Sequence, residues 1–325
     1  MSNNNILSAT DLKLYYNIRR GFTSLVVKAV DGVDLELKER EVLGIVGESG
    51  CGKSTLSRAL AGLETPTGGE IFFEGKPLSD LKRSKSKLFH KNVQMIFQDP
   101  FDSINPRYNV YETIAEGLRV QGSNRGEELT DRIRYALTQV RLTPPEAFEQ
   151  RYPFELSGGQ LQRVAVARAL VLEPKVLLAD EPVSMLDVSV RAEVLNTLTE
   201  SRESKGMAVV FVSHDIALAE YASDRLAVMY LGKVVETGQA EQVVNKPLHP
   251  YTMALIDAVP EIGKTLSDKE RILGEVASSI NVPNGCRFHP RCPYAQQICK
   301  SEEPKLREVE SGHYAACHFA GEISQ

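Results

Sequence analysis

A glycine-rich loop, Gly47-Glu-Ser-Gly-Cys-Gly-Lys-Ser-Thr55, is the most informative stretch of this sequence. It fits the pattern G-x-x-x-x-G-K-[ST] and lies between the apolar run Glu41-Val-Leu-Gly-Ile-Val46 and the helix formers Leu56-Ser-Arg-Ala-Leu-Ala61. Glycines let the backbone fold tightly around phosphate oxygens, and the positive end of the following helix adds to the attraction. This order of strand, loop and helix predicts an α/β fold that binds a nucleoside triphosphate, rather than a chance glycine-rich turn.

The side chains of this loop have defined roles if a triphosphate binds there. Lys53 would reach the β- and γ-phosphates, and the Ser54 hydroxyl would ligate Mg²⁺. The loop residues expected to contact the nucleotide are Gly47, Ser49, Gly50, Cys51, Gly52, Lys53, Ser54 and Thr55. Upstream, Leu14-Tyr-Tyr-Asn17 offers aromatic rings, and Tyr16 is the candidate for stacking on an adenine ring. Packing of both tyrosines at a sheet edge is an equally good interpretation.

The composition limits the class of protein. A length of 325 residues suggests about two domains, and 42% hydrophobic with 25% charged residues is typical of a globular protein. The net charge of −5 argues against a nucleic-acid binder. No apolar run approaches the ~20 residues that cross a bilayer, and the first residues lack the pattern of a signal peptide. We therefore expect a cytosolic protein, able to dock on a membrane partner.

Polar side chains follow two further apolar runs, where parallel strands would end. Val93-Gln-Met-Ile-Phe97 is followed by Gln98, and Lys175-Val-Leu-Leu-Ala179 by Asp180 and Glu181. Ligands of α/β folds bind at the carboxyl ends of strands. We expect Gln98 to offer its amide oxygen to Mg²⁺ or a water, Asp180 to hold Mg²⁺, and Glu181 to orient or deprotonate an attacking water. A helix cap is the alternative for the paired carboxylates.

His214 follows a third such run, Ala208-Val-Val-Phe-Val212. A lone histidine is more often structural, but at a strand end a neutral imidazole could contact the γ-phosphate and the attacking water.

The pentapeptide Leu156-Ser-Gly-Gly-Gln160 again places a serine and glycines at the start of a helix. Exposed N–H groups there form a second anion site. One nucleotide does not need two cradles in one chain, so the second is expected to face another molecule, which indicates an active dimer. A helix cap alone would explain Ser157 but not both glycines and Gln160.

Four of the five cysteines lie in the last part of the chain, beyond a charged linker that runs through Arg271. They are Cys286, Cys292, Cys299 and Cys317. Four thiolates can complete a zinc site or carry an iron–sulfur cluster. The usual C-x₂-C knuckles of zinc sites are absent, which lowers the zinc option, and free structural thiols are the remaining alternative.

Several motifs, in their order and spacing, resemble an ATP-binding cassette (ABC) ATPase subunit over about residues 6–245. They are residues 47–54, Gln98, residues 156–160, residues 176–181, Asp187 and His214. The resemblance implies an α/β P-loop fold with a parallel core sheet, an antiparallel β subdomain and a helical subdomain. It also implies a head-to-tail dimer in which ATP lies between the glycine-rich loop of one subunit and Ser157, Gly159 and Gln160 of the other. Asp187 would report across the interface, Gln98 would couple the site to a membrane partner, and Glu181 and His214 would be the catalytic glutamate and switch histidine.

The remaining residues, 246–325, resemble the small cysteine-rich extension of oligopeptide/dipeptide importer ATPases, and more the second ATPase of the usual pair than the first. The motifs that carry this resemblance are Lys246-Pro-Leu-His-Pro-Tyr-Thr252 and Cys286-Arg-Phe-His-Pro-Arg-Cys-Pro293. The resemblance implies a [4Fe–4S] cluster on the four cysteines in preference to zinc. It also implies a second homologous ATPase subunit, two transmembrane permeases, an extracytoplasmic solute-binding protein and a place at the cytoplasmic face of the cell membrane. An oligosaccharide importer and a non-transport ABC ATPase are the alternatives.

Overall fold

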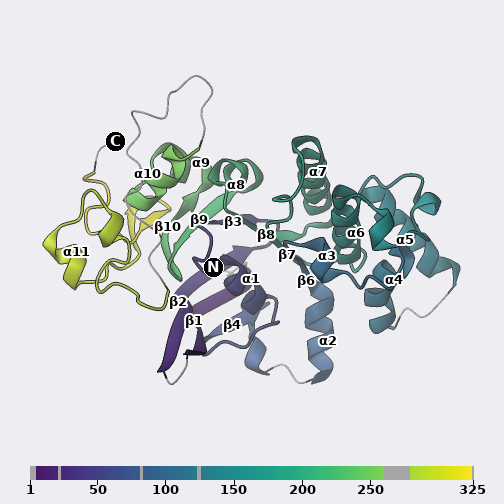
Figure 1. Cartoon of the computed structure of the whole chain (residues 1–325), viewed down its shortest axis with the longest axis horizontal. Helices are drawn as coiled ribbons and strands as arrows, with labels where there is room; N and C mark the ends of the chain where they lie inside the picture. Colours follow the sequence, from purple (N-terminus) through teal and green to yellow (C-terminus); the bar gives the residue numbers. More distant parts are fainter. Residues whose placement is uncertain (1–4, 21–22, 81–82, 123–125, 260–278, 324–325) are drawn as a thin grey trace. The chain divides into compact units, whose positions relative to one another are not determined.

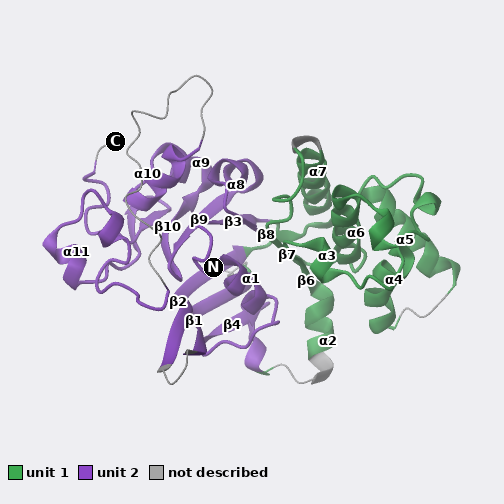
Figure 2. Cartoon of the chain, viewed as in Figure 1, with its two compact units in different colours: residues 1–6, 38–40, 80–210 green, residues 7–37, 41–79, 211–325 purple. Residues whose placement is uncertain are grey.

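The computed structural model describes residues 5–20, 23–80, 83–122, 126–259 and 279–323 (Figure 1). The chain forms two compact units (Figure 2). Unit 1 consists of Met1–Ile6, Lys38–Arg40 and Asp80–Val210, and unit 2 of Leu7–Leu37, Glu41–Ser79 and Phe211–Gln325. The boundary therefore falls inside the wholly buried strand β8 (Ala208–Ser213). The predicted charged linker lies within residues 260–278, outside the described residues.

The antiparallel β subdomain belongs to unit 2, apart from the first two residues of its first strand and Lys38 at the end of its second. It has the strand order β2-β1-β4-β5, and its strands are β1 (Asn5–Arg20), β2 (Thr23–Lys38), β4 (Gly68–Phe73) and β5 (Lys76–Pro77). Alternation within residues 25–37 predicts two short strands, and that prediction is wrong, because the chain forms the single strand β2. Gly32 adopts a φ of +75° inside it, so this glycine marks an irregularity within a strand rather than a turn between two.

The larger sheet of unit 2 is mixed rather than parallel. Its strands follow the order β11-β12-β10-β9-β3, with β3 (Val42–Val46), β9 (Arg225–Tyr230), β10 (Lys233–Gln239), β11 (Arg307–Glu310) and β12 (His313–Ala315). Only β3 and β9 pair in parallel among these, which corrects the expectation of a parallel core sheet. The reason is that a two-residue turn at Leu231 and Gly232 joins β9 to β10, and so short a connection permits only antiparallel pairing.

Unit 2 also contains five helices and a 3₁₀ turn among its described residues. They are α1 (Lys53–Leu60), α8 (Ile216–Ala222), α9 (Ala240–Asn245), α10 (Pro250–Asp257), the 3₁₀ turn η4 (His289–Arg291) and α11 (Gln297–Ser301). The C-terminal part packs on the core through Phe288, whose ring lies 5.3 Å from that of Tyr230 and 5.4 Å from that of Tyr251, measured between centroids.

Unit 1 carries the predicted helical subdomain beside a pair of parallel strands, β6 (Val93–Ile96) and β7 (Val176–Asp180). Its helices are α2 (Arg83–Asn92), α3 (Pro100–Ser103), α4 (Val110–Val120), α5 (Glu127–Gln139), α6 (Gly158–Leu170) and α7 (Val188–Lys205). Helical spacing within residues 111–142, interrupted at Gln121-Gly-Ser-Asn124, predicts a helical insert beside the nucleotide core. The structure has α4 before this interruption and α5 after it. None of the described helices combines the length and apolar composition needed to cross a bilayer.

A buried hydrogen bond between His313 and Glu236 fastens the C-terminal strands to the core. Glu236 of β10 and His313 of β12 are both fully buried, and His313 Nε2 lies 2.7 Å from Glu236 Oε1. The same carboxylate accepts the backbone N–H groups of Leu248 and His249, each at 2.8 Å. A buried carboxylate is tolerated only when it is hydrogen-bonded, so this pair makes the docking of β12 specific.

Replacing His313 by leucine, which has a similar volume, should therefore destabilise unit 2. Loss of a side-chain partner of a buried charge is expected to cost about 1.5–3 kcal/mol of unfolding free energy. Thermal unfolding followed by circular dichroism would measure the change. Tyr314→Leu, at the exposed neighbouring position of β12, is the matched control and should stay within about 0.5 kcal/mol. Equal midpoints for the two variants would contradict this role for His313.

Candidate functional site

The glycine-rich loop connects β3 to α1, as predicted. Two of its glycines lie against backbone carbonyls of other strands. A Cβ at Gly47 would lie 2.2 Å from the Met229 carbonyl oxygen, and one at Gly52 would lie 2.0 Å from that of Ala29. Gly52 is also the N-cap of α1, with a φ of +107°. Only glycine tolerates both the close approach of a carbonyl and a positive φ, so the surrounding fold fixes the curvature of the loop.

The lysine of the loop is held inside its curve. Lys53 is 5% exposed, and its ammonium donates to the carbonyl oxygens of Gly47 at 2.7 Å and Glu48 at 3.0 Å. Ser49 and Gly50 are exposed at the tip, while Ser54 and Thr55 are half-buried in the first turn of α1. The Cys51 N–H donates to Glu48 O at 3.3 Å, and burial raises the pKa of the Cys51 thiol, so this thiol is a packing group.

The two neighbouring tyrosines of β1 differ in their surroundings. Tyr16 is 36% exposed and its hydroxyl donates to Glu64. Tyr15 is half-buried, and its hydroxyl donates to Asp31. Burial and this hydrogen bond raise the pKa of Tyr15 to about 12. Of the two rings, that of Tyr16 is the more accessible to a flat ligand.

In unit 1, the predicted residues at the ends of β6 and β7 come together. The Gln98 amide nitrogen donates to Glu181 Oε2 at 3.0 Å. Asp180, the last residue of β7, is 2% exposed, and Glu181 follows with a φ of +46°. Such a backbone conformation is strained for a residue with a side chain, and strain of this kind clusters at functional sites. The Ser184 N–H and hydroxyl donate to the Glu181 carbonyl oxygen at 3.3 and 3.1 Å, which holds the turn.

The pentapeptide at residues 156–160 starts α6, and each of its polar residues has an internal role. Ser157 and Gln160 form a reciprocal capping box, with Gln160 N to Ser157 Oγ at 3.3 Å and Ser157 N to Gln160 Oε1 at 3.0 Å. A Cβ at Gly159 would lie 3.1 Å from Val190 Cγ1. By contrast, Gly158 is exposed at the helix start, and a Cβ there would meet nothing within 4 Å. Packing within the chain therefore does not explain Gly158.

Asp187 and His214 lie at two other element ends. Asp187 is exposed and caps α7, its carboxylate accepting from Val190 N at 3.0 Å. His214 is exposed between β8 and α8, and the next residue, Asp215, caps α8 through Leu218 N at 3.1 Å. Asp187 belongs to unit 1 and His214 to unit 2.

The four C-terminal cysteines line one small cavity of about 20 Å³, with free thiols. Cys286 N donates to Cys299 O at 2.8 Å, which brings the first and third cysteine segments together. Burial raises the pKa of Cys286 to about 11 and that of Cys292 to about 12, and the neighbouring cysteines add to both shifts. Nevertheless, within the described residues no group of three or more His, Cys, Asp or Glu side chains is placed to hold a metal ion. The structure thus gathers these cysteines without confirming a metal centre.

Comparison with known proteins assigns the chain to a family. The ABC transporter family matches residues 30–184, and the family described as oligopeptide/dipeptide transporter, C-terminal region, matches residues 235–299. The oligopeptide transport ATP-binding protein AppF of Bacillus subtilis is 46% identical over 97% of both chains. The di/tripeptide transport ATP-binding protein DppF of Pseudomonas aeruginosa is 42% identical over 97% of this chain and 98% of its own. The chain belongs to the ATP-binding proteins of oligopeptide/dipeptide ABC transporters. It is an ABC transporter ATPase.

Solved structures of ABC cassettes share this fold. The cassette MJ0796, solved as a dimer in a post-hydrolysis state with ADP and Pi, is 30% identical with a TM-score of 0.64, covering 72% of this chain and 98% of its own. The cbiO1 protein of Clostridium perfringens is 30% identical with a TM-score of 0.63, covering 75% of this chain and 92% of its own.

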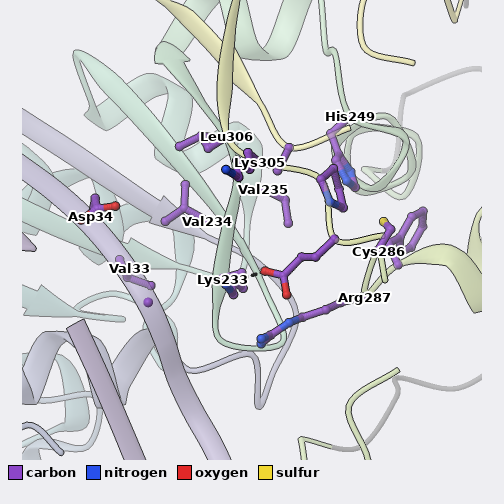
Figure 3. Close-up of a pocket in the computed structure, with 15 residues that line it drawn as sticks. Val33, Asp34, Lys233, Val234, Val235, His249, Cys286, Arg287, Lys305 and Leu306 are labelled. Atoms are coloured by element: carbon purple, nitrogen blue, oxygen red, sulfur yellow. Dashed lines mark ion pairs between the residues drawn. The ribbon is translucent and has the colours of Figure 1, made fainter. Parts of the chain in front are cut away.

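Sequence reasoning missed the residues of this ABC ATPase that contact its glycine-rich loop from the C-terminal part. Arg291 pairs with Glu48 of the loop, and the Tyr251 hydroxyl accepts from Glu48 N. A weak signal existed in the two arginines of the motif at residues 286–293, but nothing in the sequence relates them to Glu48. Beside them, Arg287 and Cys286 line a separate cavity of about 470 Å³ (Figure 3).

The carbonyl contacts of the loop give a testable contrast between two glycines. Gly50→Ala adds a methyl group that meets nothing within 4 Å, so it should cost only the left-handed strain, about 1–2 kcal/mol. Gly52→Ala should destabilise the protein clearly more, because its methyl group must displace the Ala29 carbonyl. Thermal unfolding of both variants measures the contrast, and equal midpoints would show that the loop is not confined as described.

Proposed function

We propose that this ABC ATPase binds Mg–ATP with its glycine-rich loop and hydrolyses it with Glu181 as the group that activates water. The observation that carries the proposal is the Glu181 carboxylate, held by Gln98 at 3.0 Å directly after buried Asp180. An acid at the end of a buried strand, oriented by an amide, is suited to align a water.

The binding roles follow from the chemistry of each group. Backbone N–H groups and Lys53 hold the phosphates, and Ser54, Gln98 and Asp180 supply oxygen ligands for Mg²⁺. Tyr16 stacks on the adenine ring through its accessible face. His214 donates to a γ-phosphate oxygen, or accepts a hydrogen bond from the attacking water. The loop residues that we assign to nucleotide binding are Gly47, Ser49, Gly50, Cys51, Gly52, Lys53, Ser54 and Thr55.

A second homologous ATPase subunit completes the site in this proposal. Support comes from Gly158, which is exposed at the start of α6 and is not required to be glycine by packing within the chain. A close approach of another molecule to the backbone explains both facts. Ser157, Gly159 and Gln160 would contact the partner's nucleotide, and Asp187 would face the partner across the interface.

The transport role is that of the energising subunit of an oligopeptide/dipeptide importer. Support comes from relatives whose names state oligopeptide or di/tripeptide transport and whose chains match this one nearly from end to end. The proposed partners are two transmembrane permeases and an extracytoplasmic solute-binding protein, with the ATPase at the cytoplasmic face of the membrane. Residues 1–245 form the proposed ATPase domain and residues 246–325 the transporter-type extension.

We further propose that Cys286, Cys292, Cys299 and Cys317 hold a [4Fe–4S] cluster, with zinc the less favoured occupant. Support comes from the four free thiols around one cavity. If these thiols ionise, their negative charges need a bound cation to offset them. A bound cluster would tie together the segments that carry the four cysteines.

Glu181→Gln should lower ATP turnover by about 10²–10⁴-fold, because the amide cannot take a proton from water. Binding of Mg–ATP should persist, since the residues around the phosphates are unchanged. Turnover is measured on the complex isolated from membranes by a tag on this chain, and Lys53→Met is the control that should lose binding. Normal turnover in Glu181→Gln would contradict the role that we assign to this residue.

Recovery of the chain with ribosomes or DNA instead of membrane-spanning subunits would overturn the transport role.

The cysteine site has its own measurement. Protein purified anaerobically should be brown, with broad visible absorption, and should contain iron and sulfide. Cys292→Ser should lose the colour, whereas Cys51→Ser, at the buried cysteine of the loop, should keep it. A colourless protein with one zinc ion per chain would refute the cluster.

A further inference from the structure

The C-terminal part of unit 2 forms direct hydrogen bonds with the glycine-rich loop. Arg291 donates two hydrogen bonds to the Glu48 carboxylate, from Nη1 to Oε2 at 2.7 Å and from Nη2 to Oε1 at 2.9 Å. The Glu48 N–H donates to the Tyr251 hydroxyl at 2.7 Å. Glu48 is the second residue of the loop, so both its backbone and its side chain are held from outside the loop.

A second arginine of the same segment reaches the loop through a turn. Arg287 donates to the Leu231 carbonyl oxygen and to the Asp31 carboxylate. The next residue of that turn, Gly232, donates its N–H to the Cys51 carbonyl oxygen at 2.8 Å. Residues 48 and 51 of the loop are thus both tied to the segment at residues 286–292.

The position of Arg291 is itself tightly defined. Its side chain is 6% exposed, against 19% for that of Glu48. Its guanidinium carbon lies 5.8 Å from the ring centroid of Tyr230 and 5.9 Å from that of Phe288. The hydrogen bonds to Glu48 raise the pKa of Arg291, so the guanidinium is charged. A planar, two-pronged donor packed on aromatic rings has little freedom, and it holds its acceptor in one place.

The charge of Glu48 makes this contact matter for ATP. A carboxylate within a loop that binds a triphosphate repels the ligand, and the repulsion is strong where water is scarce. Arg291 offsets that charge and directs both carboxylate oxygens to itself. Because Arg291 pairs with the Glu48 carboxylate, the Lys53 ammonium does not have to offset that charge. It donates to the backbone carbonyl of Glu48 and can bind the phosphates.

We propose that Arg291 is a positioning residue for ATP, which neutralises Glu48 and holds the glycine-rich loop in its phosphate-binding shape. The C-terminal extension is thereby part of the nucleotide-binding apparatus. The inference rests on the proposed function, in which residues 47–55 bind the phosphates.

Titration of Mg–ATP onto the full chain tests the inference, in the Glu181→Gln background so that no ATP is consumed. Arg291→Met keeps most of the side-chain length and removes the charge, and it should weaken ATP binding roughly tenfold, the scale of a lost charged hydrogen bond. Glu48→Gln alone should weaken binding less than Arg291→Met, because it loses part of the two-pronged contact but leaves no uncompensated carboxylate beside the phosphates. Glu48→Gln combined with Arg291→Met should recover most of the lost affinity, because the uncompensated carboxylate is gone. A purely structural role for Arg291 would show no such rescue.

A matched control removes another ion pair of the same extension. Lys233 of β10, labelled in Figure 3, pairs with Glu303 at 2.5 Å. This pair is distinct from the contacts that Arg291, Tyr251 and Gly232 make with the loop. Glu303→Gln should therefore bind ATP like its parent. Thermal unfolding of every variant shows whether it is folded, and Arg291→Lys, which keeps the charge without the two-pronged geometry, serves if Arg291→Met does not fold. It should lose affinity in the same direction.

Unchanged ATP affinity in folded Arg291→Met, or a loss of affinity that Glu48→Gln does not relieve, would overturn the inference. In either case the parent chain would still bind ATP and Lys53→Met would not, so the proposed function would stand. Absence of ATP binding by the parent chain would overturn both.

Discussion

The close approach of loop glycines to two backbone carbonyls is the constraint on which the functional part of this structure depends. Gly52 faces the Ala29 carbonyl of β2, and Gly47 faces the Met229 carbonyl of β9. These carbonyls come from the antiparallel subdomain and from the mixed sheet, so both must be formed before the loop has its shape. The shape of the loop is therefore fixed by the fold, which is the kind of preorganisation that the proposed binding of phosphate requires.

The C-terminal extension belongs to the same arrangement. Its strand β12 pairs with β10 and is fastened by the buried contact of His313 with Glu236. That docking places Phe288 against Tyr230 and Tyr251, and it carries Arg291 to the loop. A segment that resembles an appendage in the sequence therefore reaches the glycine-rich loop, because strand pairing and aromatic packing position it there.

Local patterns were reliable where one element carries its own signal. The loop between β3 and α1 and the break between α4 and α5 follow from glycines and periodicity. The pairing of Gln98 with Glu181 was foreseeable because parallel strands end at one edge. The prediction of two strands within β2 failed, because a glycine with positive φ occurs inside strands as well as in turns.

The sequence by itself determined the family, the glycine-rich loop and the residue types that suit phosphate, Mg²⁺ and water, because each lies in a short motif with a local physical reason. Only the tertiary structure decided that Arg291 meets Glu48 across 243 positions of sequence. It also decided that Ser157 and Gln160 satisfy each other while Gly158 stays open, and that four cysteines line one cavity. Such pairings depend on strand register and side-chain packing in three dimensions, which no local pattern encodes.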